Sequence, residues 1–282
     1  MIHPSKWRET VDPFSLPYKN FKLIKVLGYP HAGNDVFHAE GIYQDKTVEV
    51  YIKVARQLGA DIQNEVRVIT QLNLSLAPKI IDFDFGNTPF VVMIAKCGER
   101  LSVILGDNSN TSSREYLFEY GETLAKLHSI KGKFEEVKDR RFFHVRQASF
   151  FEDNNLLFVY DYLMKNKPKT VNKCFCHGDF HYANVLWSGK SISAILDFEL
   201  AGIGNREFDI AWASIRRPGQ TFLVKKEEVE LFLKGYSSVE TYNEEYVKYY
   251  MVLIYSYFYE IGIKNEEYVT YVREVFNVLC KC

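Results

Sequence analysis

The sequence lacks the biases of composition that mark several classes of protein. Its 35 lysines and arginines almost balance its 36 aspartates and glutamates, and the formal net charge is −1. A chain this close to neutrality has no general attraction for nucleic acid or for an anionic membrane surface, and we expect neither as a partner. No stretch approaches the roughly 18 consecutive apolar residues that indicate a transmembrane helix.

Cysteine is scarce and shows none of the spacings typical of a metal or redox site. The five cysteines are an odd number, and no two have the Cys-x-x-Cys spacing that is common in zinc and redox sites. We therefore interpret Cys174, Cys176, Cys280 and Cys282 as reduced thiols and expect a cytoplasmic protein. The first residues, Met1 to Trp7, lack the apolar core of a signal peptide, which agrees with that expectation.

The bulk composition is that of an ordinary folded protein. Hydrophobic residues make up 47% of the chain and charged residues 25%, as in typical globular proteins. With 282 residues the chain can bury one large core or two modest lobes. The indications of function must therefore come from particular residues and their spacing.

Three polar residues, Asp179, Asn184 and Asp197, stand out in surroundings that otherwise indicate strands and turns. Apolar runs at 185–187 and 192–196 flank a turn-forming segment and predict a β-hairpin. A hairpin of this length brings Asn184 and Asp197 opposite one another at its open end. Asp179 then lies in the loop that leads into the first strand.

The chemistry of these three side chains is typical of phosphoryl transfer. An amide oxygen beside a carboxylate forms a pair of hard oxygen ligands suited to Mg²⁺. A separate carboxylate one loop away can orient a hydroxyl group and accept its proton. Asn184 and Asp197 are therefore candidate magnesium ligands, and Asp179 is the candidate catalytic base.

Two other interpretations of this stretch compete with that one. His177, Asp179 and His181 alternate along an extended segment and could bind a transition metal, although no fourth ligand is evident. Alternatively, Asp179 and Asn184 are turn residues that make local hydrogen bonds. The second interpretation explains each residue singly but leaves the joint spacing with Asp197 unexplained.

A glycine-containing loop near the N-terminus is a candidate phosphate-binding loop. Gly28, Gly33 and Asn34 lie in the predicted tip between strands at 21–27 and 36–39. Glycine lets backbone N–H groups approach phosphate oxygens closely, although most turns with two glycines are only turns. The spacing is looser than the Gly-x-Gly-x-x-Gly pattern of protein kinases.

A lysine and a glutamate in the same region predict an ion pair. Alternation along the strand at 48–54 places Lys53 on the opposite face from the valines and the isoleucine. The helix predicted over 61–72 places Glu65 on its apolar face, where a carboxylate needs a partner. Lys53, twelve residues upstream on the adjacent strand, is a good candidate, although most strand lysines are simply solvated.

The sequence resembles the aminoglycoside phosphotransferase and choline kinase superfamily over roughly residues 20–260. The resemblance lies in three motifs: His177-Gly178-Asp179-x-His181-x-x-Asn184, Asp197-Phe198-Glu199-x-Ala201-Gly202 and Phe208-Asp209-Ile210-Ala211. Members of this superfamily share the protein-kinase-like fold and phosphorylate small molecules. The resemblance implies that Asp179 is the catalytic base and that Asn184 and Asp197 hold Mg²⁺. It also implies ATP or GTP as the phosphoryl donor.

The resemblance assigns roles to further residues of the N-terminal part. It implies that Lys53 and Glu65 together position the α- and β-phosphates of the nucleotide. It places the adenine against the segment that follows the last strand, with hydrogen bonds to the backbone of Ile94 and Lys96. Met93 then lies behind the adenine.

We therefore predict an α+β, bilobal protein-kinase-like fold. A small antiparallel lobe covers residues 1–96, with an irregular arm over 1–20, and a mainly helical lobe covers 97–282. By the resemblance, Asp209 braces the catalytic loop from the start of a helix rather than reacting. Only eleven residues separate Asp197 from Asp209, which leaves little room for the activation loop of a protein kinase.

The predicted function is the ATP- and Mg²⁺-dependent phosphorylation of a hydroxyl group on a small molecule, with the oligomeric state open. An aminoglycoside acceptor is a polycation and would require several carboxylates. From Glu199 onward, however, 13 acidic residues are interleaved with 10 basic ones. The acids considered for this role are Glu199, Glu227, Glu228 and Glu230.

Two alternative functions remain open beside phosphorylation of an aminoglycoside. A choline or ethanolamine acceptor would require aromatic faces, which the tyrosines of 242–259 and Trp212 offer. The protein could also be a catalytically silent nucleotide-binding pseudokinase. The presence of Asp179, Asn184 and Asp197 argues against that last alternative.

Overall fold

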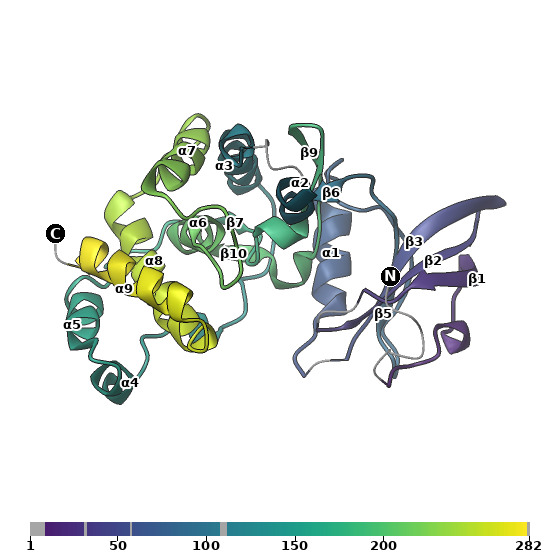
Figure 1. Ribbon diagram of the computed structural model, residues 1–282. Coiled ribbons are helices and arrows are strands. Elements are labelled where there is room, and N and C mark those ends of the chain that lie inside the picture. The colour runs from purple at the N-terminus through teal and green to yellow at the C-terminus, as the bar shows by residue number, and fades with distance from the viewer. Residues whose placement is uncertain (1–8, 31–32, 57, 108–111, 281–282) are drawn as a thin grey trace. The chain divides into compact units, whose positions relative to one another are not determined.

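The computed structural model describes residues 9–30, 33–56, 58–107 and 112–280 (Figure 1). The chain divides into two compact units. Unit 1 contains the described residues up to Glu99 together with 185–188 and 193–201. Unit 2 contains the described residues of 100–184, 189–192 and 202–282.

The predicted lobe boundaries, 1–96 and 97–282, stay a prediction, and unit 1 does not coincide with residues 1–96. Two short stretches that come late in the sequence fold with unit 1. One reason is a backbone hydrogen bond of 3.0 Å, in which the N–H of Ile195 donates to the carbonyl of Leu76. The ion pairs described below are another.

Unit 1 is built on one antiparallel sheet. Its strands are β1 (Phe21–Gly28), β2 (Asp35–Tyr43), β3 (Lys46–Val54), β4 (Ile80–Asp84) and β5 (Phe90–Ile94). They lie in the order β1-β2-β3-β5-β4, and each neighbouring pair runs antiparallel. The antiparallel sheet predicted for the N-terminal lobe is confirmed, and it has five strands. Its core includes Phe37, Val50, Ile52, Phe90 and Val92, all fully buried.

Helix α1 (Ile62–Leu72) contacts β4 and β5 of this sheet (Figure 1). It begins after Asp61, whose carboxylate accepts the N–H of Asn64 at 3.0 Å as an N-cap. It ends at Asn73, which has a left-handed backbone with φ of 45°. The buried face of α1 carries Glu65 among apolar residues, as the sequence predicted.

The predicted hairpin is present and belongs mainly to unit 1. It consists of β8 (Val185–Ser188) and β9 (Ser191–Ile195), and the turn between them contains Gly189 with φ of 61°. The short strand β6 (Glu99–Arg100) pairs with β8 on the other side. A 3-10 turn, η5 (Phe198–Leu200), follows the hairpin.

Unit 2 is mainly helical. Its helices are α2 (Leu101–Asp107), α3 (Arg114–His128), α4 (Ala148–Asp153), α5 (Leu157–Lys165), α6 (Arg206–Ser214), α7 (Lys226–Ser237), α8 (Glu244–Ile261) and α9 (Glu266–Cys280). The antiparallel pair β7 (Lys173–Cys176) and β10 (Gly202–Asn205) adds a small sheet. In the described ranges, no helix combines the length and apolarity needed to cross a lipid bilayer.

Helices α3 and α7 approach so closely that only glycine fits at two positions. A Cβ atom on Gly121 of α3 would lie 1.9 Å from the carbonyl oxygen of Phe232. A Cβ atom on Gly235 of α7 would lie 2.0 Å from the carbonyl oxygen of Phe118. Because both obstacles are backbone atoms, the helices would have to move apart to admit a methyl group.

This contact predicts that Gly121→Ala destabilises the protein. We expect a loss of roughly 1–3 kcal/mol in the free energy of unfolding, measured by urea denaturation, because overpacking forces a backbone shift. Gly106→Ala is the matched control, because alanine favours the helix and, among the described residues, its added Cβ would meet no atom within 4 Å apart from its chain neighbours and its own helix backbone. Equal stability of the two variants would show that the α3–α7 contact tolerates a side chain.

Candidate active site

Lys53 of unit 1 lies among three carboxylates. Its Nζ atom is 2.8 Å from Glu65 Oε2, 2.7 Å from Asp197 Oδ1 and 2.8 Å from Glu199 Oε2. The predicted ion pair of Lys53 with Glu65 is present. The contact with Glu199 was missed, because nothing in the spacing of an acid 146 residues downstream (199 − 53) signals it.

The electrostatics of this cluster follow from burial and from the unequal number of charges. Burial lowers the pKa of Lys53, but Glu65, Asp197 and Glu199 more than offset this effect, and the pKa is raised well above its ordinary value. Burial raises the pKa of Glu65, whereas Lys53 lowers it, and the net direction is upward. One ammonium group facing three carboxylates leaves an excess of negative charge. Such an excess suits a divalent cation.

Glu199 is held by groups from two other parts of unit 1. Asn34 donates its side-chain N–H to Glu199 Oε2 at 2.8 Å, and the backbone N–H of Asp61 donates to Oε1 at 2.9 Å. The side chain of Asn64 donates to the backbone carbonyl of Glu199, also at 2.9 Å. The turn after the hairpin is thereby joined to the start of α1.

The predicted phosphate-binding loop is only partly described. Gly28 ends β1 opposite His38 of β2, whereas residues 31 and 32 of the loop lie outside the described residues. The side-chain oxygen of Asn34 accepts the N–H of Arg56 at 3.2 Å, and its amide faces Glu199. Nucleotide binding by Gly28, Gly33 and Asn34 stays a prediction.

Asp197 has an unusual backbone and a partly exposed carboxylate. Its φ of 64° and ψ of 66° lie in the left-handed region, which costs a residue other than glycine roughly 1–2 kcal/mol. Its side chain is 42% exposed although Lys53 contacts one oxygen. The following N–H, of Phe198, donates to Glu65 at 3.2 Å. Local strain that keeps a carboxylate accessible is typical of a ligand-binding residue.

Asp179 of unit 2 lies in a network of donors. Trp212 of α6 donates its indole N–H to Asp179 Oδ1 at 2.8 Å. Asn184 donates its side-chain N–H to the Asp179 backbone carbonyl at 3.0 Å and to Oδ2 at 3.2 Å. His181 Nε2 lies 3.5 Å from Oδ2. The contact with Trp212 had no signal in the sequence.

These surroundings keep the carboxylate ionised. Burial raises the pKa of Asp179, but His181, Arg217 and His177 lower it more strongly, and the result is about 2. The residue is therefore an anion throughout the physiological range.

Asn184 and Asp197 retain oxygens suited to a magnesium ion. The Asn184 amide nitrogen is engaged with Asp179, which leaves its carbonyl oxygen as the candidate ligand. Asn184 belongs to unit 2 and Asp197 to unit 1. Their pairing as metal ligands remains a prediction.

Asp209 contacts the loop that carries Asp179. Its carboxylate accepts the backbone N–H groups of His177 at 2.9 Å and Gly178 at 3.0 Å. It also contacts His128 Nε2 at 3.1 Å, while His128 Nδ1 lies 2.7 Å from the Tyr236 hydroxyl. The predicted brace is present, and His128 is an additional member that the sequence did not reveal. Asp209 is not the first residue of its helix, because α6 begins at Arg206.

Two groups of metal-ligating side chains occur among the described residues. One is Glu65, Asp197 and Glu199, and the other is His128, Cys174 and Cys176. Neither includes His177, Asp179 or His181, so the transition-metal interpretation of that segment gains no support. Cys174 and Cys176 are free thiols with Sγ atoms 3.7 Å apart.

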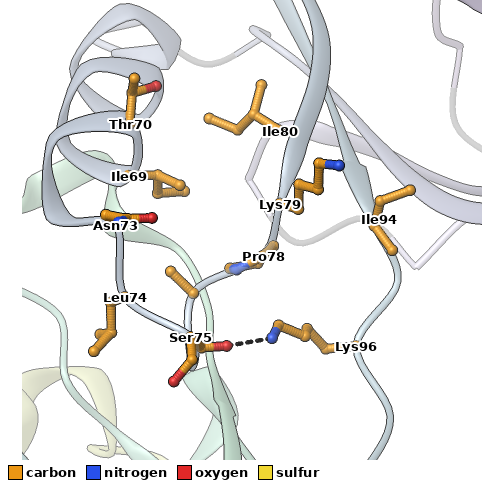
Figure 2. Close-up of a pocket in the computed structure, with 11 residues that line it drawn as sticks. Ile69, Thr70, Asn73, Leu74, Ser75, Pro78, Lys79, Ile80, Ile94 and Lys96 are labelled. Atoms are coloured by element: carbon orange, nitrogen blue, oxygen red, sulfur yellow. Dashed lines mark hydrogen bonds between the residues drawn. The ribbon is translucent and has the colours of Figure 1, made fainter.

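The residues predicted to contact adenine lie at the end of β5. The N–H of Ile94 already donates to the carbonyl of Lys79 at 2.9 Å. The ammonium group of Lys96 contacts the carbonyl of Ser75 (Figure 2). Ile94 and Lys96 line a cavity of about 500 Å³ together with Ile69 and other residues of α1 and β4. Adenine binding by Met93, Ile94 and Lys96 stays a prediction.

Known proteins share both the sequence pattern and the fold. The model of the family described as "Phosphotransferase enzyme family" matches residues 42–242. An aminoglycoside 3'-phosphotransferase from Niallia circulans is 24% identical over 251 residues, which cover 82% of this chain and 90% of that protein.

Three solved structures match over almost the whole chain. A spectinomycin phosphotransferase in complex with ADP and spectinomycin has a TM-score of 0.56 and 15% identity, covering 92% of each chain. A thermostable mutant of an aminoglycoside phosphotransferase with ADP and hygromycin B has a TM-score of 0.62 and 11% identity, covering 94% of each. A choline kinase from Streptococcus pneumoniae has a TM-score of 0.57 and 15% identity, covering 95% of each. The predicted α+β, protein-kinase-like fold is confirmed.

The His128–Asp209 contact predicts a dependence of stability on pH. Burial lowers the pKa of His128, but Asp209 and Cys174 raise it more, to about 9 from an ordinary value of 6.5. A group whose pKa is raised on folding contributes stability that is fully present below its unfolded pKa and is lost as pH rises through its folded pKa. We therefore expect this contribution to decline between pH 6.5 and about 9.

Urea denaturation at several pH values tests this expectation. His128→Gln should reduce the slope of unfolding free energy against pH across that interval. His144→Gln, at a histidine whose side chain is 61% exposed, should leave the slope unchanged. Parallel slopes for the parent protein and His128→Gln would show that the buried histidine does not bind the extra proton.

Proposed function

We propose, from the premise that the chain belongs to the phosphotransferase enzyme family, that it transfers the terminal phosphoryl group of ATP to a hydroxyl group of a small molecule. The observation that carries this proposal is the position of Asp179. It is an ionised carboxylate held by Trp212 and Asn184, on a loop whose backbone is fixed by Asp209. A fixed acceptor of this kind can align a hydroxyl group for in-line attack.

The role of Asp179 follows from its low pKa. A carboxylate with a pKa of about 2 is a weak proton acceptor at neutral pH. Its contribution is therefore to accept a hydrogen bond from the hydroxyl group and to orient the oxygen. The proton moves to Asp179 only as the new bond to phosphorus forms and the hydroxyl becomes strongly acidic.

Asn184 and Asp197 would hold Mg²⁺. The fit rests on their hard oxygen donors, on the exposed and conformationally strained carboxylate of Asp197, and on the excess of carboxylates around Lys53. When bound, the ion would neutralise charge on the phosphate oxygens.

Lys53 and Glu65 would bind the nucleotide phosphates. The support is the ion pair itself, since Glu65 fixes the ammonium group of a lysine that is almost fully buried. The nucleotide is ATP or GTP. Two of the related structures contain ADP, which agrees with a purine nucleotide as donor.

The family resemblance leaves the acceptor undetermined. The relative from Niallia circulans is an aminoglycoside 3'-phosphotransferase, so aminoglycosides belong among the compounds to test. A choline or ethanolamine kinase is the alternative, and a silent pseudokinase is disfavoured because the candidate catalytic residues are all present. We further propose a cytoplasmic enzyme with no nucleic-acid or membrane partner, on the grounds of near-neutral charge and reduced thiols.

Replacement of the candidate base tests the chemistry. Asp179→Asn should lower kcat by roughly 10²–10⁴-fold, because the hydroxyl loses its positioned acceptor. Nucleotide affinity should be unchanged, and coupled ADP release measures the rate. Asp161→Asn makes the same chemical change at an exposed position of α5 and is the control, which should leave kcat unchanged. A kcat near that of the parent protein would remove Asp179 from this role.

Replacement of the buried lysine tests the nucleotide site. Lys53→Ala should weaken ATP binding and lower the melting temperature, because Glu65 and Glu199 lose the cation that balances them. The loss of one member of a buried pair costs roughly 3–5 kcal/mol. Lys46→Ala, at the exposed start of the same strand, is the control. If affinity and melting temperature both stayed constant, the lysine would have no part in the site.

A further inference from the structure

Two arginines of unit 2 lie near the candidate base without a carboxylate partner. Arg217 is only 9% exposed, and its guanidinium donates to the backbone carbonyl of Trp212 at 2.9 Å. Arg140 is half-buried. Within the described part of the chain, neither guanidinium group contacts an acidic side chain within ion-pair distance. Both stay charged at neutral pH, since arginine does not lose its proton in proteins.

Both arginines are close enough to Asp179 to interact with its charge. Burial lowers the pKa of each guanidinium group, and the charge of Asp179 is the largest opposing influence on both. Burying a positive charge without a direct partner is unfavourable. Asp209 is a second, smaller influence on Arg140. Two guanidinium groups without an ion-pair partner among the described residues therefore require an explanation.

Trp212 joins the two arginines to the base. The guanidinium carbons of Arg140 and Arg217 lie 5.3 and 5.1 Å from the centre of its ring. Arg140 also lies 4.9 Å from the ring of Phe143 and 5.6 Å from that of Phe208. The indole N–H of Trp212 meanwhile donates to Asp179. The side chain of Arg140 is thus held by aromatic rings rather than by hydrogen bonds, and its donors remain available.

This arrangement argues against a cationic acceptor. A quaternary ammonium group would need an aromatic face, but the ring of Trp212 already lies within cation–π distance of two guanidinium groups. A further cation there would be repelled by both. The tyrosines proposed for the same purpose are largely core residues, since Tyr249, Tyr255 and Tyr259 are buried.

The carboxylates that a polycation would need are engaged elsewhere. Glu228 is buried and accepts the backbone N–H groups of residues 224 and 225. Glu230 pairs with Lys226 at 3.2 Å, and Glu199 faces Lys53 in unit 1. These three acids are therefore engaged with other groups, whereas two guanidinium groups lie near the candidate base.

We propose that the acceptor carries an anionic group, a carboxylate or a phosphate ester, in addition to the hydroxyl group that is phosphorylated, and that Arg140 binds this anion. The planar guanidinium group offers paired donors that match the oxygens of either anion. Arg217 is buried against Trp212 and adds positive potential without touching the ligand. This inference rests on the proposed function, because it concerns the acceptor of the same reaction.

The test is the rate of ADP release from the full-length protein with ATP, Mg²⁺ and a panel of acceptors. The anionic compounds are D-glycerate and D-gluconate as hydroxy carboxylates and glycerol 3-phosphate as a phosphate ester. Glycerol and D-ribose are neutral, and choline and kanamycin are cationic. We expect the highest kcat/KM with an anionic compound. Comparison of the hydroxy carboxylates with the phosphate ester shows which of the two anionic groups is recognised.

Variants of Arg140 then locate the anion. Arg140→Gln should raise KM for the anionic acceptor about 10- to 100-fold, the usual effect of removing a charged hydrogen bond, with kcat and the KM for ATP little changed. Arg140→Lys should restore part of the loss. Arg141→Gln is the control, because that neighbouring arginine lies over Phe142 and Tyr257 instead.

The possible outcomes are distinguishable. Turnover of cationic or neutral compounds in preference to every anionic one would overturn the inference and leave the proposed function intact. An equal fall of kcat for all acceptors in Arg140→Gln would assign the arginine to the transferred phosphoryl group, and would also overturn it. Absence of nucleotide-dependent transfer to any compound would contradict the proposed function itself.

Discussion

Unit 1 depends on one buried ammonium group. Lys53 comes from the central part of the sheet, Glu65 from α1, and Asp197 and Glu199 from the turn after a hairpin far along the chain. A lysine at this depth is tolerated only because carboxylates surround it. The same attraction fixes α1 against the sheet and draws residues 193–201 into unit 1. Residues 193–201, which follow the loop of Asp179 in the sequence, therefore fold with unit 1.

In unit 2, Asp209 holds the loop that carries Asp179. Its two carboxylate oxygens accept hydrogen bonds from the two backbone N–H groups that precede Asp179. His128 also contacts this carboxylate through Nε2. A loop whose own N–H groups are satisfied in this way cannot easily change its conformation. The candidate base that it carries is thus held in one orientation, and the proposed phosphoryl transfer would require such preorganisation.

The two candidate sites have opposite electrostatic character. Around Lys53 the carboxylates outnumber the cation, which suits magnesium and its nucleotide. Around Asp179, Arg140 and Arg217 add positive charge, and neither has an ion-pair partner among the described residues. The similarity to an aminoglycoside 3'-phosphotransferase does not remove this difference. In our proposal the local charges select the acceptor, and such charges differ among proteins that share a fold.

The sequence by itself determined the strands of the sheet, helix α1, the hairpin, the pairing of Lys53 with Glu65 and the brace at Asp209. The first four depend on local periodicity or on short spacing, which one sequence displays directly, whereas the brace was implied by the family resemblance. Only the tertiary structure placed Glu199 beside Lys53, His128 beside Asp209, and Arg140 beside Trp212. These pairs lie 146, 81 and 72 residues apart (199 − 53, 209 − 128 and 212 − 140). No periodic signal connects such positions, because long-range contacts form only when separate elements pack together.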